Sequence, residues 1–330
     1  LAHILAVEAF LKTAGGLPCS VKFLLDGEEE SGSPSLAALV EANKGLLACD
    51  IVYFADGPIH YSGRPQVIFG CRGVLDVEIE IRDNVRDCHS GHFGGVISNP
   101  AWKMTHLLTS MCTTDGEALV EGFYDGVRRI TEAEAEALRS IPFEQASYLD
   151  GVGIPEVEGR DPVDTLKRIM FRPTMTVAGL ASGHTGAGMR TIVPCRAVSK
   201  LDMRLVADQD PDQVFDCIVK HVKARVPGAQ VSSLGKMYPS RTSMDLPVSK
   251  AIVGAVRSAW GMEPVVLPST GASCPDYVFT RILGVPSVMV PYANVDESNH
   301  GPNENISIDL FMKGIQTSVH AMEAIGVLRE

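Results

Sequence analysis

The sequence predicts an α/β domain interrupted by an inserted α+β sandwich. Up to about Gly70, helical segments alternate with short apolar runs, which is typical of buried strands in a mostly parallel sheet. From Leu75, polar and apolar residues alternate strictly, which indicates a half-exposed antiparallel strand and hence a second domain. The first pattern returns near the C-terminus. We therefore expect residues 1–71 and 245–330 to form one domain and residues 72–244 to be the insertion.

The outer segments are expected to contribute helices and buried strands in turn. Residues 1–11 have the periodicity of an amphipathic helix but lack Met and a capping residue, so we expect a preceding segment to be missing. Apolar runs between turn signals predict the strands, and apolar periodicity with Pro and Gly at the ends predicts the helices. Strands are expected at 21–25, 51–55 and 287–290, and helices from residue 33, over 248–260 and from residue 308.

The inserted segment has the pattern of a small sandwich. Val77, Ile79 and Ile81 fall on one face of the alternating strand, and acidic residues fall on the other. Asn99 is a suitable cap for the helix that follows it. Further elements are expected as a helix over 100–111, loops and short helices over 113–161, a strand at 199–205 and a helix over 210–224.

Composition excludes several classes of function. The 330 residues are 45% hydrophobic and 21% charged, as in soluble globular proteins, and no stretch approaches the roughly 20 apolar residues that span a bilayer. A net charge of −11 disfavours binding to nucleic acid, because phosphates carry the same sign. The eight cysteines contain no CxxC pair, and several lie beside apolar residues. With no visible signal peptide, buried thiols of this kind favour a reducing, cytoplasmic location.

Acidic residues follow two of the predicted strands. The segment 26–33 contains four acids, including Glu29 and Glu30, and Asp56 follows the strand at 51–55. Carboxylates this close repel one another unless a cation neutralises them. Taken alone, the segment 26–33 is equally compatible with a solvated turn, and Asp56-Gly57-Pro58 is more often a turn. Because both strands are expected to end at the same edge of the sheet, where α/β folds bind ligands, the repetition favours a metal site.

Two histidines and one arginine add to this pattern. His300 lies in a loop at the same predicted edge, and imidazole with carboxylates is the ligand set of Zn²⁺, Mn²⁺ or Co²⁺ rather than Ca²⁺. His89 follows the alternating strand region, and an exposed turn is the simpler interpretation there. Arg204 is charged among apolar neighbours, and an outward position on an alternating strand explains it as well.

Taken in chain order, these motifs resemble the M20 family of metallopeptidases, which includes dipeptidases, carboxypeptidases and aminoacylase-type deacylases. The resemblance spans almost the whole chain. It rests on Glu28-Glu29-Glu30-Ser31-Gly32-Ser33, Asp56, His89-Ser90-Gly91, Arg204, Gly271-Ala272-Ser273-Cys274-Pro275 and His300-Gly301-Pro302-Asn303-Glu304.

The resemblance implies a dinuclear metal site. Glu29 would be the general base, Glu30 and His300 would bind one metal ion, and Asp56 would bind the second. The implied cofactors are two divalent ions, with Zn²⁺ favoured and Mn²⁺ or Co²⁺ as alternatives. A metal-bound water, deprotonated by Glu29, would attack the amide carbonyl of the substrate.

The same resemblance implies substrate contacts and a homodimer. His89 would reach across a homodimer interface, formed by the inserted domain, to polarise the carbonyl in the partner subunit. Arg204 would clamp the free carboxylate of the substrate, because a guanidinium fork matches that anion. Gly271 and Ser273 would contact the substrate backbone.

Some family features are absent from this sequence. The family has a metal-binding His and a bridging Asp in motifs upstream of the helix that opens this chain, so the Asp56 site would keep one of three protein ligands. We therefore expect an active parent protein and an inactive or nearly inactive 330-residue chain. Ala272 and Cys274 replace the more common Gly and Ile of the family's turn. Residues 245–247 lack a His that dipeptidases often carry there.

The predicted function is hydrolysis of an amide bond next to a free carboxylate, with a dipeptidase favoured by the loop at 89–95. A deacylase of N-acylated amino acids is the alternative within the family. The alternative from another class is a non-catalytic binding or dimerisation module. Metal content distinguishes them, because the hydrolase requires about two ions per chain and the module requires none.

Overall fold

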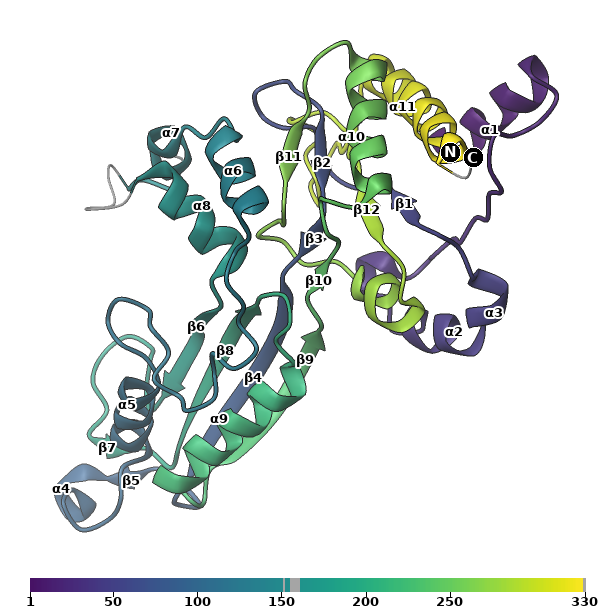
Figure 1. The fold of residues 1–330 in the computed structure, drawn as a ribbon. Coiled ribbons are helices and arrows are strands. Elements are labelled where there is room, and N and C mark those ends of the chain that lie inside the picture. Colours follow the sequence, from purple (N-terminus) through teal and green to yellow (C-terminus); the bar gives the residue numbers. More distant parts are fainter. Residues whose placement is uncertain (151, 155–160, 329–330) are drawn as a thin grey trace. The chain divides into compact units, whose positions relative to one another are not determined.

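The computed structural model describes residues 1–150, 152–154 and 161–328 (Figure 1). The chain divides into two compact units. Unit 1 comprises Leu1–Cys71, Arg129–Met170 and Ser240–Glu330, and unit 2 comprises Arg72–Arg128 and Phe171–Pro239. The segment Arg129–Met170, which lies within the expected insertion, thus groups with unit 1. The catalytic and lid roles assigned to the two parts stay a prediction.

Unit 1 contains a mixed four-stranded sheet in the order β1-β12-β2-β11. Its strands are β1 (Val52–Phe54), β12 (Ser287–Met289), β2 (Gln66–Ile68) and β11 (Val265–Leu267). The β1–β12 and β2–β11 pairs are parallel, and β12 runs antiparallel to β2. The predicted α/β class is therefore confirmed. The strands β2 and β11 were not among those expected.

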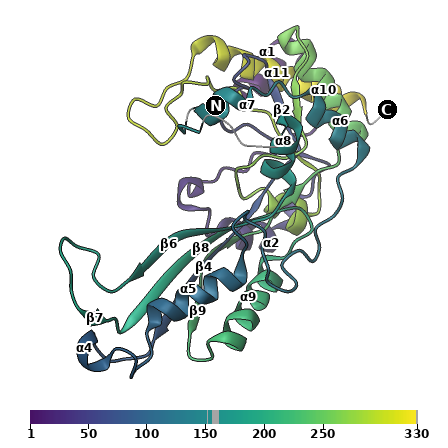
Figure 2. The same ribbon diagram turned by 90° about the vertical axis from the view of Figure 1, so that its left-hand side faces the viewer.

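Three long helices accompany this sheet, as Figure 1 and Figure 2 show. They are α1 (Ala2–Thr13), α10 (Pro247–Trp260) and α11 (Ile308–Val327), with α11 in contact with both others. Helix α10 begins with Pro at its first position and ends at Gly261, whose φ of 70° suits glycine best. Its Ile252 and Val256 are fully buried against Val67 and Val288 of the sheet.

The remaining helices of unit 1 are short. Helices α2 (Leu36–Ala42) and α3 (Lys44–Leu47) lie beside a π-helix, η2 (Val278–Leu283). Helices α6 (Glu132–Ser140), α7 (Gln145–Asp150) and α8 (Pro162–Phe171) fall within the range 113–161 or follow it, where short helices were expected. Residues 151 and 155–160 of that range lie outside the described residues. A two-stranded sheet joins β3 (Gly70–Cys71) to β10 (Ser240–Arg241).

The prediction of a strand at 21–25 is wrong. No strand is assigned there, and no ladder partner for this segment occurs among the described residues. Leu25 is 81% exposed and Phe23 is 46% exposed. An apolar run forms a strand only where a neighbouring strand accepts its backbone hydrogen bonds, and hydrophobicity alone does not reveal whether that neighbour is present.

Unit 2 is the expected α+β sandwich. Its antiparallel sheet has the order β6-β8-β4-β9, formed by β6 (Thr174–Ser182), β8 (Arg196–Leu205), β4 (Gly73–Arg82) and β9 (Gln230–Met237). Helices α5 (Pro100–Met111) and α9 (Pro211–Arg225) cover one face, as Figure 2 shows. Leu75, Val77, Ile79 and Ile81 are at most 1% exposed, as the alternating pattern predicts.

The sequence predicted the positions of the two long helices of unit 2, α5 and α9, correctly. The Asn99 side chain accepts a hydrogen bond from the Ala101 backbone N–H at 2.9 Å, which caps α5 as predicted. Asp210 caps α9 in the same way through the Asp212 N–H. Beyond the main sheet lie the short strands β5 (Cys88–His89) and β7 (Ile192–Val193) and the helix α4 (Ser90–Phe93).

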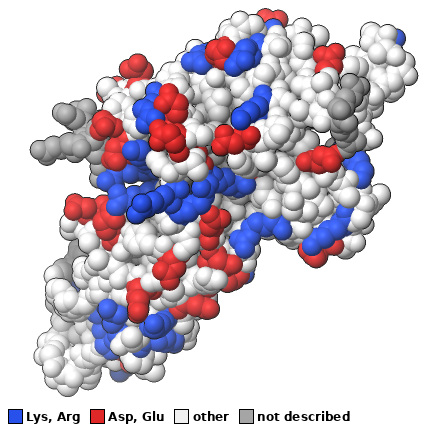
Figure 3. All heavy atoms as spheres, in the orientation of Figure 1, with Lys and Arg blue, Asp and Glu red and all other residues white. Residues whose placement is uncertain are grey.

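The surface carries both signs of charge. On the face drawn in Figure 3, Lys and Arg side chains lie among Asp and Glu side chains. Within the described part of the chain, no helix is long and apolar enough to cross a membrane.

Candidate functional site

The acidic segment 26–33 is organised by its own hydrogen bonds. Asp26 accepts from the Glu28 N–H at 2.9 Å and from the Ser33 hydroxyl at 2.6 Å, which lowers the pKa of Asp26. Glu28 accepts from the Ser35 N–H at 3.1 Å. Two of the four acids therefore stabilise this turn, in which Glu29–Ser31 form a short 3-10 helix, η1. Glu29 and Glu30 remain available for other contacts.

Asp56 follows β1, as predicted, and a second segment holds it in place. The backbones of Gly57 and Ala293 are hydrogen-bonded at 3.2 Å, and the Ile59 N–H donates to the Ala293 carbonyl at 2.8 Å. Parallel pairing of β1 with β12 leads directly into this contact, because both strands end at the same edge. Asp56 is thus held beside the loop that begins at residue 294.

The loop 294–305 is closed by polar contacts and carries unusual backbone angles. Asn294 bonds the Asn305 side chain at 3.1 Å and accepts from the Ser307 N–H at 2.8 Å, which joins the two ends. Ser298, His300 and Asn303 have φ values of 61°, 57° and 63°. Non-glycine residues in this region cost about 1 kcal/mol or more, and such strain clusters at functional sites.

This loop brings His300 to Glu30. The His300 Nε2 and Glu30 Oε2 atoms lie 3.0 Å apart, and the side chains are 73% and 76% exposed. The two residues predicted to share one metal ion are therefore adjacent in space. Their exposure leaves room for a further partner.

Glu29 lies within the electrostatic reach of the same groups. Partial burial raises the pKa of Glu29, and the neighbouring charges of Asp56, Glu30 and Asp26 raise it further, while His300 opposes them. Like charges at short range penalise the ionised form. Glu29, Glu30, Asp56 and His300 consequently form one cluster in unit 1, called here the 29/30/56/300 cluster.

Sequence reasoning missed Glu297. Its side chain is buried, at 8% exposure, and burial together with Glu304 and Asp56 raises the pKa of Glu297. A buried carboxylate next to Asp56 adds a fourth acid to the 29/30/56/300 cluster. The signal was the pair of acids at 296 and 297 in the loop of His300, which could have been weighed with the other motifs.

The cluster fits a divalent cation in its donor chemistry. Imidazole nitrogen and carboxylate oxygens are the ligands of Zn²⁺ and similar ions, and mutual repulsion of the acids favours a cation among them. Glu30 and His300 are close enough to act as two ligands of one ion. Among residues 1–150, 152–154 and 161–328, no group of three or more His, Cys, Asp or Glu side chains is arranged to hold a metal ion. The described residues thus supply a pair of ligands, with Asp56 nearby.

Gly271 and Ser273 lie in the turn between β11 and η2 in unit 1. The Thr270 N–H donates to the Gly70 carbonyl at 2.9 Å, and the Ala272 N–H donates to the Thr270 hydroxyl at 3.3 Å. Both residues are half-buried. The turn is therefore attached to β3, which gives these backbone groups a defined position.

His89 and Arg204 belong to unit 2. His89 is exposed and accepts from the Gly91 N–H at 3.0 Å, which caps the short helix α4. Arg204 lies on β8, between buried Met203 and Leu205, with its Nε donating to Asp202 at 3.2 Å. Asp76 also feels the charge of Arg204, which opposes the rise in its pKa caused by burial and Asp202. These contacts match the outward, polar-face alternative for Arg204, and its substrate role stays untested.

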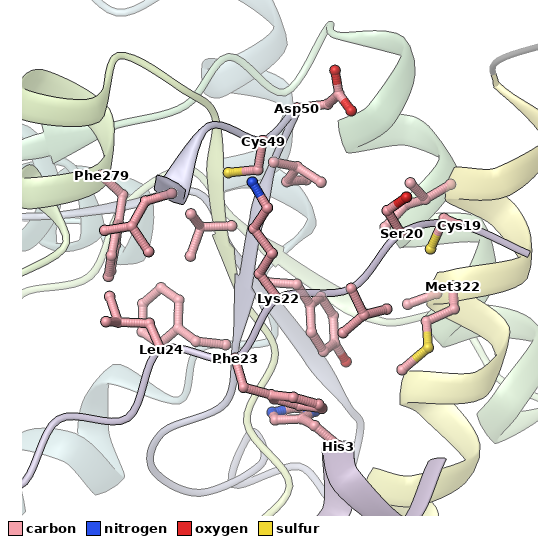
Figure 4. A pocket seen from close by; sticks show the side chains of 18 of the residues that line it. His3, Cys19, Ser20, Lys22, Phe23, Leu24, Cys49, Asp50, Phe279 and Met322 are labelled. Carbon is pink, nitrogen blue, oxygen red and sulfur yellow. The ribbon is translucent and has the colours of Figure 1, made fainter. Parts of the chain in front are cut away.

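A separate cavity of about 750 Å³ lies elsewhere in unit 1 (Figure 4). Its walls come from α1, the segment 19–25, β1 with the residues preceding it, η2 and α11. Lys22, Phe23 and Leu24 run along it, and Lys22 donates to the Ala48 carbonyl at 2.6 Å. Within the described residues that line it, none belongs to the 29/30/56/300 cluster. The cavity thus lies beside the segment 21–25, which forms no strand, and is not part of the candidate site.

Comparison with known proteins identifies a protein family that matches this chain. The model of peptidase family M20/M25/M40 matches residues 1–324. The chain is 27% identical to the beta-Ala-His dipeptidase of Homo sapiens over 325 residues, which cover 95% of this chain and 64% of that protein. It is 25% identical to the Cys-Gly metallodipeptidase of Schizosaccharomyces pombe, with 98% and 70% covered.

Solved structures agree with these relatives. The M20 family metallo-carboxypeptidase Sso-CP2 of Sulfolobus solfataricus has a TM-score of 0.91 and 32% identity, over 99% of this chain and 75% of that one. Human carnosine dipeptidase 1 has a TM-score of 0.76 and 25% identity, over 99% and 71%. The chain thus spans slightly less than two thirds of the length of the human beta-Ala-His dipeptidase. The match over nearly all of its residues shows that the chain belongs to peptidase family M20/M25/M40.

Proposed function

We propose that the protein is a divalent-metal-dependent hydrolase that cleaves the amide bond of a dipeptide or a similar small substrate with a free carboxylate. The observation that carries the proposal is the convergence of Glu29, Glu30, Asp56 and His300 from three segments of unit 1. Three of the four similar proteins reported above are named dipeptidases, which favours a dipeptide over an N-acylated amino acid.

The residues of the 29/30/56/300 cluster have different proposed roles, according to their chemistry. Glu30 and His300 would hold one ion and Asp56 a second, with Zn²⁺ favoured and Mn²⁺ or Co²⁺ as alternatives. A bound divalent ion lowers the pKa of water and polarises a carbonyl. Glu29, with its raised pKa, is suited to accept a proton from water at near-neutral pH and to return it to the leaving amine.

The proposal includes four finer parts. Gly271 and Ser273 contact the substrate backbone, and Arg204 binds its carboxylate. The segment 72–244 forms a homodimer with His89 at the interface. The protein acts in the cytoplasm. The 330-residue chain by itself is inactive or nearly so, because Glu30 and His300 alone hold an ion weakly compared with a site of three or four ligands.

The test combines metal titration with hydrolysis. Zn²⁺, Mn²⁺ and Co²⁺ are titrated calorimetrically into the chain and into the longest product of its gene, and both are assayed on β-Ala-His, Cys-Gly and N-acetyl amino acids. We expect the longest product to bind about two ions and to cleave dipeptides. Glu29→Gln should keep metal binding and lose about 100-fold or more in kcat, as removal of a general base does.

Glu41→Gln is the matched control. Glu41 is an exposed acid in α2 that pairs with Lys44 at 2.9 Å, so its loss should leave binding and hydrolysis unchanged. Cleavage of N-acetyl amino acids in preference to dipeptides would favour a deacylase. An absence of metal binding and of hydrolysis in every product would reject the hydrolase in favour of a binding module.

A further inference from the structure

Two cysteine side chains meet beside the turn that carries Gly271 and Ser273. Cys71 ends β3 and Cys274 lies in the turn, 203 positions later in the sequence, with the two Sγ atoms 3.4 Å apart. Both residues belong to unit 1, and both are free thiols. Cys71 is 2% exposed, whereas Cys274 is only partly buried. Of the two residues, Cys274 is therefore the more exposed.

The backbone around the pair is held from both sides. On one side, the Thr270 N–H donates to the Gly70 carbonyl, and Thr270 forms a parallel bridge with Cys71. On the other side, β3 pairs with β10, where Ser240 Oγ lies 3.3 Å from the Cys71 sulfur. The thiol of Cys71 also points to the Cys274 carbonyl at 3.4 Å. The spacing of the two chain segments is therefore set before any bond forms.

A covalent bond requires only a short movement. Disulfide sulfurs lie about 2.05 Å apart, so the pair must close by roughly 1.4 Å, to which both side-chain rotation and a movement of the turn 270–275 contribute. We propose that Cys71 and Cys274 form a reversible disulfide, a modification site that ties the turn 270–275 to β3. The oxidant is a hydroperoxide, of which hydrogen peroxide is the simplest.

The reaction balances in two steps. Hydrogen peroxide oxidises one of the two thiols to a sulfenic acid and is itself reduced to water. The sulfur of the other cysteine then attacks the oxidised sulfur, the S–S bond forms, and hydroxide leaves with the attacking thiol's proton as a second water. The hydrogen bond that Cys274 donates lowers the pKa of the Cys71 thiol against the opposing effect of burial and raises the pKa of Cys274, so Cys71 supplies the more reactive thiolate of the pair.

The consequence for activity rests on the proposed function. The turn that the disulfide would displace carries Gly271 and Ser273, the proposed contacts to the substrate backbone. Displacements of about 1 Å at positioning groups reduce turnover by up to about 100-fold. Oxidation should therefore lower kcat/KM reversibly, with thiol reductants restoring it.

The direct test is the chemical link itself. The chain is treated with hydrogen peroxide, its remaining thiols are alkylated, and it is digested without reduction for mass spectrometry. We expect a peptide pair joined through Cys71 and Cys274, lighter by two hydrogen atoms and separated by dithiothreitol. Cys274→Ser and Cys71→Ser should each abolish the pair. Cys217→Ser, which changes a half-buried thiol on α9 of unit 2, should leave it intact.

Activity is measured separately on the longest gene product, reduced and oxidised. If the disulfide forms and the reduced protein hydrolyses no substrate, the proposed hydrolase function is wrong and the disulfide proposal is supported. If the reduced protein is active and both Cys71 and Cys274 can still be alkylated after oxidation, the disulfide proposal is wrong and the proposed hydrolase function is unaffected. If the disulfide forms and kcat/KM stays unchanged, the proposed effect of the disulfide on substrate binding by the turn 270–275 is wrong.

Discussion

His300 Nε2 lies 3.0 Å from Glu30 Oε2, although the two residues come from opposite ends of the chain. Both side chains are more than 70% exposed, so the pair contributes at most about 1 kcal/mol to stability. The backbone of His300 is in the left-handed region, which costs about the same or more. The His300–Glu30 pair stabilises the fold by no more than the backbone conformation of His300 costs. A ligand held by both side chains explains the arrangement better than stability does.

Loss of His300 should weaken divalent-metal binding. Since removal of partners that merely orient a ligand costs 10–100-fold in affinity, removal of the ligand itself by His300→Ala should weaken Zn²⁺ binding by about 100-fold or more. Isothermal titration calorimetry measures this. His320→Ala is the control, because His320 on α11 also faces a carboxylate, that of Glu323 at 3.6 Å. Equal losses in both variants would contradict the role of His300.

Glu29→Gln should raise the melting temperature of the metal-free chain at pH 7. The folded state raises the pKa of Glu29, so its favourable contribution to folding is present below the unfolded pKa and is lost as pH rises through the folded pKa. Gln removes the repulsion with Asp56 and Glu30. Thermal unfolding from pH 3 to 8 should show the gain only above the ordinary glutamate range. A gain that persists at pH 3 would show a cause other than charge.

Glu134→Gln should destabilise unit 1. Glu134 on α6 forms an ion pair with Arg241 on β10, and the side chains are only 6% and 11% exposed. Gln keeps the capping box with Thr131 but leaves a buried cation without its counter-charge, which costs about 3–5 kcal/mol. Urea unfolding measures the loss. Glu132→Gln, at a position 87% exposed on the same helix, should change the free energy of unfolding by less than about 0.5 kcal/mol.

Two glycine substitutions should have opposite signs. A Cβ on Gly70 would lie 2.5 Å from the Ser240 carbonyl oxygen, so Gly70→Ala must separate β3 from β10 and should cost about 1–3 kcal/mol. Gly254 lies inside α10 with nothing within 4 Å of its Cβ position. Gly254→Ala should therefore stabilise the chain by about 0.5–1 kcal/mol. Denaturant unfolding of both variants measures the two changes in the free energy of unfolding. Destabilisation by Gly254→Ala would show that the Cβ position is not free of neighbours.

Elements with strong local signals were predictable. The alternation of β4 identified its buried face, and Asn99 identified where α5 begins. These features depend on periodicity and on capping within a few residues. The strands β2 and β11 were not predicted, although β1 and β12, which also have three residues each, were predicted from their apolar runs.

The candidate site was predictable in its members but not in its surroundings. Residue type and chain order selected Glu29, Glu30, Asp56 and His300, which the structure brings together, and their roles stay a prediction. The burial of Glu297 beside Asp56 depends on how the loop 294–305 folds back. The contact of Cys71 with Cys274 likewise depends on a bridge between segments far apart in the chain.

The amino-acid sequence by itself determined the fold class, the family motifs and the chemistry of the donor groups. Tertiary structure decided three further matters: that 21–25 is not a strand, that 129–170 groups with unit 1, and that two thiols meet beside the turn at 270–275. The physical reason is that helix caps and alternation are local properties of the chain. Strand pairing, burial and side-chain contact arise only when distant segments are brought together.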